Sequence, residues 1–361
     1  MPPPVTAIEN LGQPFLTPGL PGIGGALKEL PEDFVVEEIP AYQPCGSGKH
    51  LFLWIEKRDT SAEQLTSHIA RTLGIRRDEV GTAGLKDRRA VTRQFVSVPA
   101  GTEDQVPKIE SDDIRVLDQT RHTNKLRTGH LRGNRFSILV RDVHPDSVDR
   151  VDQISQRIKE CGFPNYYGDQ RFGIENRTLQ TGLDLLSGKT DQRRIPRSRR
   201  KFLLRLSLSA AQSSLFNQVL AERISDGLMQ IVVIGDVMQV VESGGCFVAE
   251  DLEQEQPRFE RRETVMTGPI FGPKMKCPRE EVETRELRIL ERNGLTADDF
   301  SRFKKLTSGT RRPLLIQPTE LEFAEEDDGL RFSFTLSRGT YATVLLREFM
   351  KAVTPAPNHQ S

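Results

Sequence analysis

The first half of the chain is dominated by short runs in which apolar and polar residues alternate. Such runs are typical of β-strands, and they predict strands over residues 34–39, 50–57, 94–98, 114–118 and 134–143. Between the second and third runs the period changes, because Leu65, Ile69 and Leu73 are four residues apart. This spacing predicts a helix over 60–75, with Thr60 and Glu63 in capping-box positions and Gly74 as the C-cap. Together these patterns predict an α+β fold with a mainly antiparallel mixed sheet.

Helical and strand patterns also alternate in the second half of the chain. We expect helices over 209–224, 278–295 and 338–353, and strands within 236–250 and 330–337. Residues 162–176 are irregular and rich in glycine, and residues 193–205 carry seven cations without an acid, so a boundary or hinge is expected there. The last strand and helix resemble the first half of the chain. We therefore expect an extended lead-in over 1–25, a core of 26–161 and 316–361, and a domain inserted at 162–315.

Composition narrows the possible functions. With 51 Lys+Arg and 51 Asp+Glu in 361 residues, the net charge is zero, which argues against a general polyanion binder and directs attention to local clusters. The four cysteines are scattered without a CxxC pair, so neither a disulfide framework nor a zinc knuckle is expected. The chain shows neither a signal-peptide pattern nor an apolar run long enough to span a membrane, and we expect a soluble, cytoplasmic protein.

The segment GTAGLKDRRAVTRQFVSV, residues 81–98, holds the densest candidate chemistry. Lys86, Asp87, Arg88 and Arg89 lie in a glycine-flanked turn that runs directly into a strand. A carboxylate among cations stays ionised at neutral pH, as a carboxylate nucleophile must. Taken by itself, such a cluster is more often a solvated surface turn. It is not a P-loop, because the glycine spacing is wrong and Asp87 stands where Ser or Thr should bind magnesium.

The same segment resembles a family signature. AGLKDRRAVTRQ is similar to the signature of the TruD family of tRNA pseudouridine synthases, in which the aspartate after the lysine is the nucleophile. Further blocks resemble this family in the same order, namely KELPEDFVVEEIP, GKHLFLWIEKRDTS, LRGNRFSILVRD, NYYGDQRFG, TGPIFG and SRGTYATVLLRE. Several blocks in order are more specific than any single motif. The resemblance implies a pseudouridine synthase core with an inserted α/β TRUD domain.

The resemblance also implies roles for individual residues. Asp87 would attack either C1′ of the ribose or C6 of the base, and Lys28 would keep it ionised, although an exposed structural lysine is an equal alternative. Phe34, Phe136 and Asn134 match pocket positions of the family, where aromatic rings stack on a flipped uracil and an amide pairs with its edge. Without the resemblance, the two rings would be core residues and Asn134 a turn residue.

Two positions depart from the family pattern. Tyr341 stands where the family often has phenylalanine, so the ring is kept but a buried hydroxyl needs a partner. Asp59 and Thr60 stand where the family usually shows Asn-Thr, a difference that we expect to alter a helix cap rather than the chemistry.

Two basic runs are candidate RNA contacts. Residues 121–141 contain six Lys/Arg and no acid, and residues 193–205 contain seven. Such runs are often solvated faces, but two of them on either side of NYYGDQRFG favour binding to phosphates. The residues expected to contact RNA are Lys86, Arg88, Arg132, Arg135, Arg171, Arg199, Arg200 and Lys201. Arg171 lies in the expected joint between domains, where structural support is its primary expected role.

The function that these observations favour is isomerisation of uridine to pseudouridine in tRNA, and the family implies uridine 13 of the D arm. The reaction would need no cofactor and no metal, and the enzyme would act as a monomer without an obligate protein partner. The alternative is a non-catalytic RNA-binding or RNA-folding protein on the same scaffold, against which the intact GLKD segment argues. A zinc nucleobase deaminase is excluded because HxE and PCxxC elements are absent.

Overall fold

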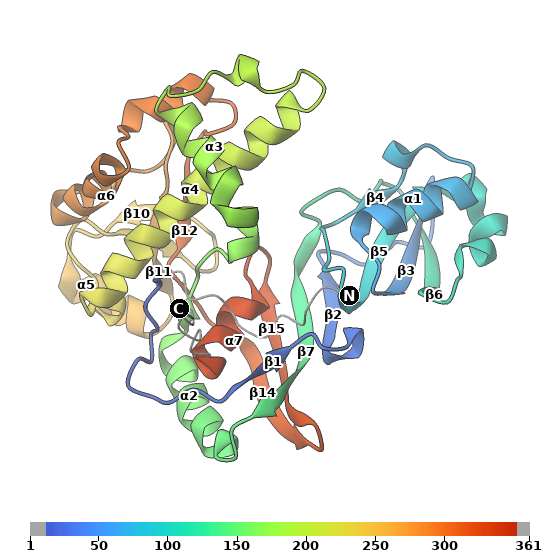
Figure 1. Ribbon diagram of the computed structural model, residues 1–361, viewed down its shortest axis with the longest axis horizontal. Coiled ribbons are helices and arrows are strands. Elements are labelled where there is room, and N and C mark those ends of the chain that lie inside the picture. Colours follow the sequence, from blue (N-terminus) through green and yellow to red (C-terminus); the bar gives the residue numbers. More distant parts are fainter. Residues whose placement is uncertain (1–11, 352–361) are drawn as a thin grey trace, which may run out of the picture.

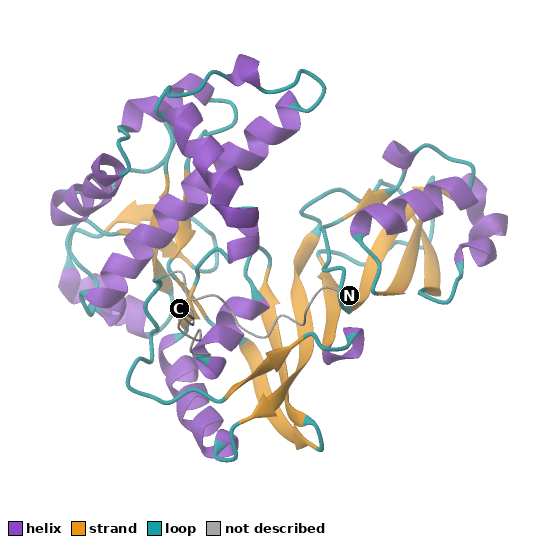
Figure 2. Cartoon of the chain, viewed as in Figure 1, coloured by secondary structure: helices purple, strands orange, loops and turns teal. Residues whose placement is uncertain are grey.

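The computed structural model describes residues 12–351. Figure 1 shows two lobes joined by long strands, with β7 and β15 between them, and Figure 2 shows that both lobes combine helices with strands. The fold is therefore α+β, as the sequence predicts. In the part of the chain that the structure describes, no helix is both long and apolar enough to cross a membrane.

A nine-stranded sheet forms the centre of the fold. Its strands follow the order β14-β15-β7-β2-β5-β3-β6, while β1 pairs with β7 and β4 pairs with β5. The bounds are β1 Gly24–Leu27, β2 Phe34–Pro40, β3 His50–Arg58, β4 Gly81–Thr82, β5 Val91–Pro99, β6 Ile114–His122, β7 Leu131–Val143, β14 Thr319–Glu326 and β15 Gly329–Ser337. The pair β2–β5 is parallel, and the other pairs of this sheet are antiparallel. The expectation of a mainly antiparallel sheet is confirmed.

The long strand β7 explains how residues far apart in the sequence come to share one face. It lies between β2 and β15, so that Phe136 stands opposite Val36 on one side and Phe334 on the other. Because alternate residues of a strand point to the same face, Asn134, Phe136 and Ile138 share a face. Helix α7 (Ala342–Met350) covers part of this face, where Phe349 packs on Phe332 with ring centroids 4.9 Å apart.

The lobe formed by the early strands has its own core. Helix α1 (Ala62–Thr72) packs Leu65 and Ile69 against apolar residues of β3 and β5. The predicted helix is present, but its cap is shifted by one residue. The hydroxyl of Ser61 accepts a hydrogen bond from the backbone N–H of Gln64, and the Gln64 side chain accepts one from the backbone N–H of Ser61. The capping box is thus Ser61 and Gln64, because Thr60 donates its hydroxyl to the carbonyl of Arg58 instead.

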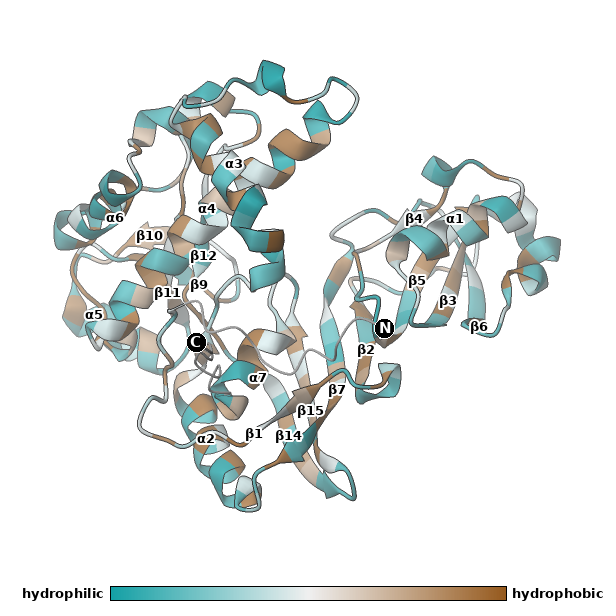
Figure 3. Ribbon diagram, in the orientation of Figure 1, coloured by the Kyte–Doolittle hydropathy of each residue, from teal (hydrophilic) through white to brown (hydrophobic). Residues whose placement is uncertain are grey.

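The other lobe contains most of the helices and a second sheet with the order β10-β9-β11-β12. The elements are α2 Ser147–Cys161, α3 Arg177–Leu186, α4 Arg200–Ser225, α5 Leu252–Glu260, α6 Glu280–Arg292, β9 Val237–Val240, β10 Cys246–Val248, β11 Thr264–Ile270 and β12 Thr310–Pro313, with the short pair β8 Phe163–Pro164 and β13 Leu315–Ile316. Hydrophobic residues line β11 in Figure 3, whereas α6 is largely hydrophilic. That helix carries three glutamates in its first turn and buries one face.

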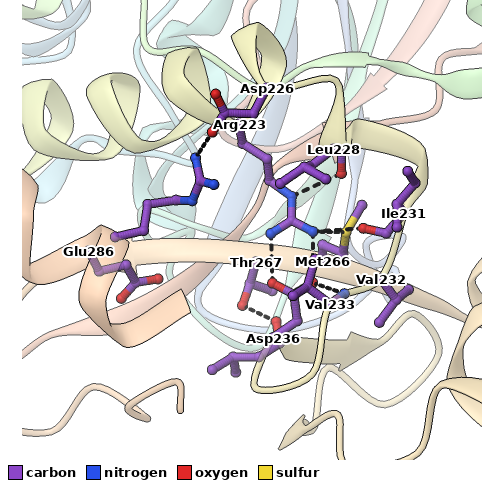
Figure 4. Close-up of polar contacts among 12 residues, drawn as sticks. Arg223, Asp226, Leu228, Ile231, Val232, Val233, Asp236, Met266, Thr267 and Glu286 are labelled. Carbon is purple, nitrogen blue, oxygen red and sulfur yellow. Dashed lines mark hydrogen bonds and ion pairs between the residues drawn. The ribbon is translucent and has the colours of Figure 1, made fainter. Parts of the chain in front are cut away.

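A buried ion pair connects α4 with the segment before β9 (Figure 4). The guanidinium group of Arg223 donates to both carboxylate oxygens of Asp236 over 2.7 Å, and the two side chains are 3% and 2% exposed. Arg223 also donates to the carbonyls of Leu228 and Ile231. Paired in this way, the two charges satisfy each other inside the lobe.

The described part of the predicted lead-in packs on helix α7. The backbone N–H groups of Leu16 and Thr17 donate to the carboxylate of Glu348, and residues 24 and 25 already belong to β1. Residues 1–11 lie outside the described residues. The segment 162–315 has its own sheet, yet Phe216 and Met266 belong to the same apolar core as Phe334 and Phe349. The domain bounds given above stay a prediction.

Candidate active site

The turn that carries Asp87 connects β4 with β5 and is anchored at two points, one on its backbone and one through the Arg89 side chain. Arg89 donates to the carbonyl of Glu29 over 2.7 Å, and Lys57 donates to the carbonyl of Asp87 over 2.8 Å. The Asp87 side chain is 38% exposed. The turn is thus held in place while the Asp87 carboxylate remains accessible to a ligand.

Lys28 approaches Asp87 from the end of β1. Its ammonium nitrogen lies 3.3 Å from Oδ1 of Asp87 and 4.0 Å from the centre of the Phe34 ring. The Lys28 backbone has a φ of +59°, in the left-handed region that residues other than glycine and asparagine rarely adopt. This turn places the ammonium between the ring and the carboxylate, so that a cation–π contact and an ion pair hold the same group. The structure thus brings Lys28, Asp87 and Phe34 together, as the resemblance implies.

Lys57 was missed by the sequence analysis, which placed it only at the end of a strand. Its side chain is fully buried, and its ammonium group donates to the carbonyls of Asp87 and Thr60 over 2.8 and 2.6 Å. The pKa of Lys57 is lowered to about 8, because burial and the charge of the neighbouring Lys86 lower it more than Asp87 and Asp59 raise it. The available signal was the lysine that breaks the apolar alternation of HLFLWIEK, where a polar residue falls on the buried face.

Lys86 lies in a different position from the one expected. Its ammonium group binds a carboxylate oxygen of Glu38 over 2.8 Å, and the two side chains are 4% and 1% exposed. To reach a phosphate, this ammonium group would have to leave Glu38, so the expected RNA contact of Lys86 stays a prediction that this conformation does not favour. The pair instead attaches the Asp87 turn to β2.

Of the two expected pocket rings, Phe34 lies beneath Lys28 and Phe136 packs against Phe34. Phe34 and Phe136 are buried, and their centroids lie 6.2 Å apart in an edge-on arrangement. Phe136 also stacks on Phe334 at 5.3 Å. In this conformation the rings are core residues that support the site, and a base would reach them only by displacing what covers them.

Asn134 stands opposite Glu38 across the β2–β7 pairing. Its side-chain oxygen and Oε1 of Glu38 are both buried and have no hydrogen-bond partner within the described residues. Buried acceptors without donors are uncommon and cost free energy. Two of them on neighbouring strands, next to the Asp87 turn, suit a site whose ligand supplies N–H or O–H donors.

Tyr341 joins a second cluster at the start of α7. Its ring lies edge-on to Tyr167 at 6.2 Å, and the guanidinium group of Arg312 lies 4.1 Å from the centre of the Tyr167 ring. Arg312 donates to the carbonyl of Gly339, two residues before Tyr341. Burial raises the pKa of Tyr341, while the charges of Arg171 and Arg312 oppose that shift. The NYYGDQRFG segment therefore supports the start of α7.

The remaining residues expected to contact RNA differ in whether their side chains are exposed or paired within the protein. Arg88, Arg132, Arg199 and Lys201 are exposed. Arg135 is exposed but faces Glu37 at 3.6 Å and Glu320 at 3.7 Å. The other two arginines serve the protein itself, since Arg171 donates to the hydroxyls of Ser209 and Ser213 and Arg200 donates to the carbonyl of Ile195.

Comparison with known proteins identifies the family of the chain. The family model described as "tRNA pseudouridine synthase D (TruD)" matches residues 10–193 and 189–349. The chain is 42% identical over 344 residues to the tRNA pseudouridine synthase D of Anaeromyxobacter dehalogenans, covering 95% of this chain and 98% of that protein. It is 41% identical to the protein of that name from Thermus thermophilus, covering 94% and 92%. A crystal structure described as the putative tRNA pseudouridine synthase D of Methanosarcina mazei shares the fold, with a TM-score of 0.75 and 24% sequence identity. The match covers 92% of this chain and 95% of that chain.

Fold, site and relatives define the protein as an RNA-modifying isomerase of the pseudouridine synthase class. It belongs to the tRNA pseudouridine synthase D (TruD) family. The resemblance seen in the sequence is confirmed.

Proposed function

We propose that this protein converts uridine 13 in the D arm of tRNA to pseudouridine, with Asp87 as the nucleophile. The observation that carries the proposal is the geometry at Asp87, where an accessible carboxylate lies 3.3 Å from the Lys28 ammonium group. A reaction at an electrophilic sugar or ring carbon needs an anionic nucleophile held in one place. Lys57 supplies that positioning through the Asp87 backbone.

The isomerisation requires no net gain or loss of atoms. The carboxylate of Asp87 adds to C1′ of the ribose or to C6 of the uracil, the bond between N1 and C1′ breaks, and the base turns within the site. A bond then forms between C5 and C1′, the carboxylate is released, the proton on C5 is lost, and N1 takes up a proton, so that the atoms balance. Lys28 stabilises the carboxylate before attack and after release. The unpartnered oxygen of Asn134 would accept a hydrogen bond from the uracil edge.

Recognition of the RNA would rest on the exposed cations Arg88, Arg132, Arg199 and Lys201, with Arg135 and Tyr341 as further contacts. Because the target base must leave its stack to reach Asp87, we expect the enzyme to hold the RNA mainly by its backbone and shape. We also propose that it acts in the cytoplasm as a monomer of 40.7 kDa, which light scattering in solution tests directly.

The decisive test compares Asp87→Asn with the wild type on total tRNA. Asn keeps the size of the side chain but removes the nucleophilic charge, so we expect tRNA binding within twofold of the wild type and no pseudouridine by carbodiimide mapping. The matched control is Asp112→Asn, an exposed aspartate, which should retain full activity. Substantial turnover by pure Asp87→Asn would refute the nucleophile, and modification at another position would refute the proposed target.

A further inference from the structure

A cavity of ≈ 630 Å³ lies at one end of the early strands. Its lining includes Tyr42, His50, His122 and His130, together with Lys125 and Arg127. Among its lining residues, all within the described part of the chain, none is acidic. Three of the six histidines of the protein therefore meet two cations at one place, without a carboxylate to balance them.

The hydrogen bonds of the cavity leave it rich in donors. The Nδ1 atom of His122 accepts from the backbone N–H of Cys45 at 3.3 Å, and Nδ1 of His130 lies 2.7 Å from the Tyr42 hydroxyl and 3.4 Å from the backbone nitrogen of Arg127. When Nδ1 of a neutral histidine accepts, its proton is on Nε2. Both imidazoles then offer an Nε2–H donor beside the ammonium group of Lys125 and the guanidinium group of Arg127.

The third histidine of the cavity, His50, has a ring nitrogen without a hydrogen-bond partner among the described residues. This nitrogen, Nδ1, is buried. Burial lowers the pKa of His50, and the charge of Lys125 lowers it further. A cluster of donors and like charges is unfavourable when empty and is relieved by an acceptor with negative charge.

The cavity also contains an aromatic surface. The rings of Tyr42 and His122 are stacked, with centroids 5.1 Å apart and an angle of 24° between their planes. Stacks of tyrosine and histidine are surfaces on which unpaired RNA bases are held.

The cavity is connected to the Asp87 turn. Leu126 packs with Ala83 and Phe52 in a small buried cluster, and the backbone N–H of Gly129 donates to the carbonyl of Ala83 over 2.7 Å. Ala83 lies four residues before Asp87. The loop that lines the cavity therefore rests on the segment that leads into the candidate nucleophile.

We infer that this cavity binds a single-stranded nucleotide of the RNA substrate, with its phosphodiester on Lys125, Arg127 and the imidazoles and its base against the Tyr42–His122 stack. The inference rests on the proposed function and adds a second point of attachment to it. An RNA bound both in this cavity and at Asp87 has two points of attachment to the protein, which favours extrusion of the target uridine.

The test is the double variant Lys125→Gln/Arg127→Gln, with tRNA binding measured by fluorescence anisotropy across a series of KCl concentrations. Each lost phosphate contact lowers the slope of log Kd against log salt by about 0.7–0.9, so we expect a decrease of about 1.5 and a Kd roughly tenfold higher at moderate salt. Because Lys125 also donates to the carbonyl of Asp78, the single variant Arg127→Gln is measured as well, with an expected slope decrease of about 0.7.

The matched control is Lys274→Gln/Lys276→Gln, which removes the same charge at two exposed lysines near the start of α6. It should leave the slope unchanged. An unchanged slope in both cavity variants, or an equal decrease in the control, would overturn the inference. Failure of the proposed function looks different, because Asp87→Asn would then remain active whatever the cavity variants show.

Discussion

The ammonium group of Lys57 lies inside the protein and donates a hydrogen bond over 2.8 Å to the backbone carbonyl of Asp87. Its second bond, to the carbonyl of Thr60, connects the Asp87 turn to the segment between β3 and α1. A buried charge is costly, and here that cost is offset by two carbonyl acceptors and by the carboxylates of Asp87 and Asp59. Lys57 therefore holds the backbone of Asp87, while Lys28 forms an ion pair with its carboxylate.

Replacing Lys57 with methionine keeps most of the side-chain volume and removes both hydrogen bonds. We expect kcat to decrease about 10- to 100-fold, because small displacements of a reacting group have effects of this order. The KM for tRNA should change less than threefold, since the variant leaves the exposed cations intact. Single-turnover kinetics measure the first quantity and anisotropy the second. An unchanged kcat would show that the Asp87 turn holds its shape without Lys57.

The pH dependence of Lys57 separates its role in activity from its role in stability. Because its pKa is about 8 in the folded protein and 10.5 in the unfolded chain, the unfolded state binds the extra proton between these values. The wild type should therefore gain stability relative to Lys57→Met from pH 8 to 10.5, by up to roughly 3 kcal/mol. Activity should decrease over the same range as the ammonium group loses its charge. Urea unfolding and kcat/KM profiles of both proteins test the two opposite trends.

Lys28→Met removes the charge that faces the Asp87 carboxylate and keeps an aliphatic chain over Phe34. We expect kcat/KM to decrease at least about tenfold, because the carboxylate loses the cation that stabilises its charged form. Stability should change by less than about 1 kcal/mol, as for other partly exposed ion pairs. The control is Lys305→Met, an exposed lysine in the other lobe. A large loss of stability together with activity would mark Lys28 as structural.

The buried pair of Lys86 and Glu38 should show strong coupling. Each single variant, Lys86→Met or Glu38→Leu, leaves an uncompensated charged group in the protein interior and should destabilise it by about 3–5 kcal/mol. The double variant Lys86→Met/Glu38→Leu should cost clearly less than the sum, because it removes both charges. Urea unfolding of the three variants gives the coupling energy. Additive costs would show that the two groups do not depend on each other.

Most strands and several helices could be predicted from the sequence, because their patterns depend on local periodicity. The strand predicted over 134–143 lies within β7, and the helix predicted over 60–75 contains α1. The boundaries of elements next to irregular segments were harder to predict from the sequence. Helix α4 begins at Arg200 inside the basic run, where no apolar period marks its start. The cap of α1 depended on which of two adjacent hydroxyls, Thr60 or Ser61, accepts the hydrogen bond from the first turn of the helix.

The basic run over 121–141 shows why the charge environment could not be predicted in the same way. It contains no acid in sequence, yet folding brings acids to three of its six cations. Arg121 pairs with Glu103, Arg135 faces Glu37 and Glu320, and Arg141 binds Asp33 and Asp328. The two residues of each of these pairs lie far apart in the sequence, and only strand pairing and long loops bring them together. The cations left for RNA are those in the loop and at the start of β7, namely Lys125, Arg127 and Arg132.

The Arg223–Asp236 pair in the other lobe offers a test of the structure that is independent of catalysis. Asp236→Asn leaves the Arg223 guanidinium group buried without its counter-charge, and we expect a loss of about 3–5 kcal/mol. The folded fraction should nevertheless isomerise tRNA at the wild-type rate, since neither residue contacts the candidate site. Glu63→Gln, which breaks the exposed pair with Arg77, should cost less than about 1 kcal/mol. Thermal unfolding and single-turnover assays compare the variants. If Asp236→Asn were as stable as Glu63→Gln, the connection between α4 and the segment before β9 would not depend on this ion pair.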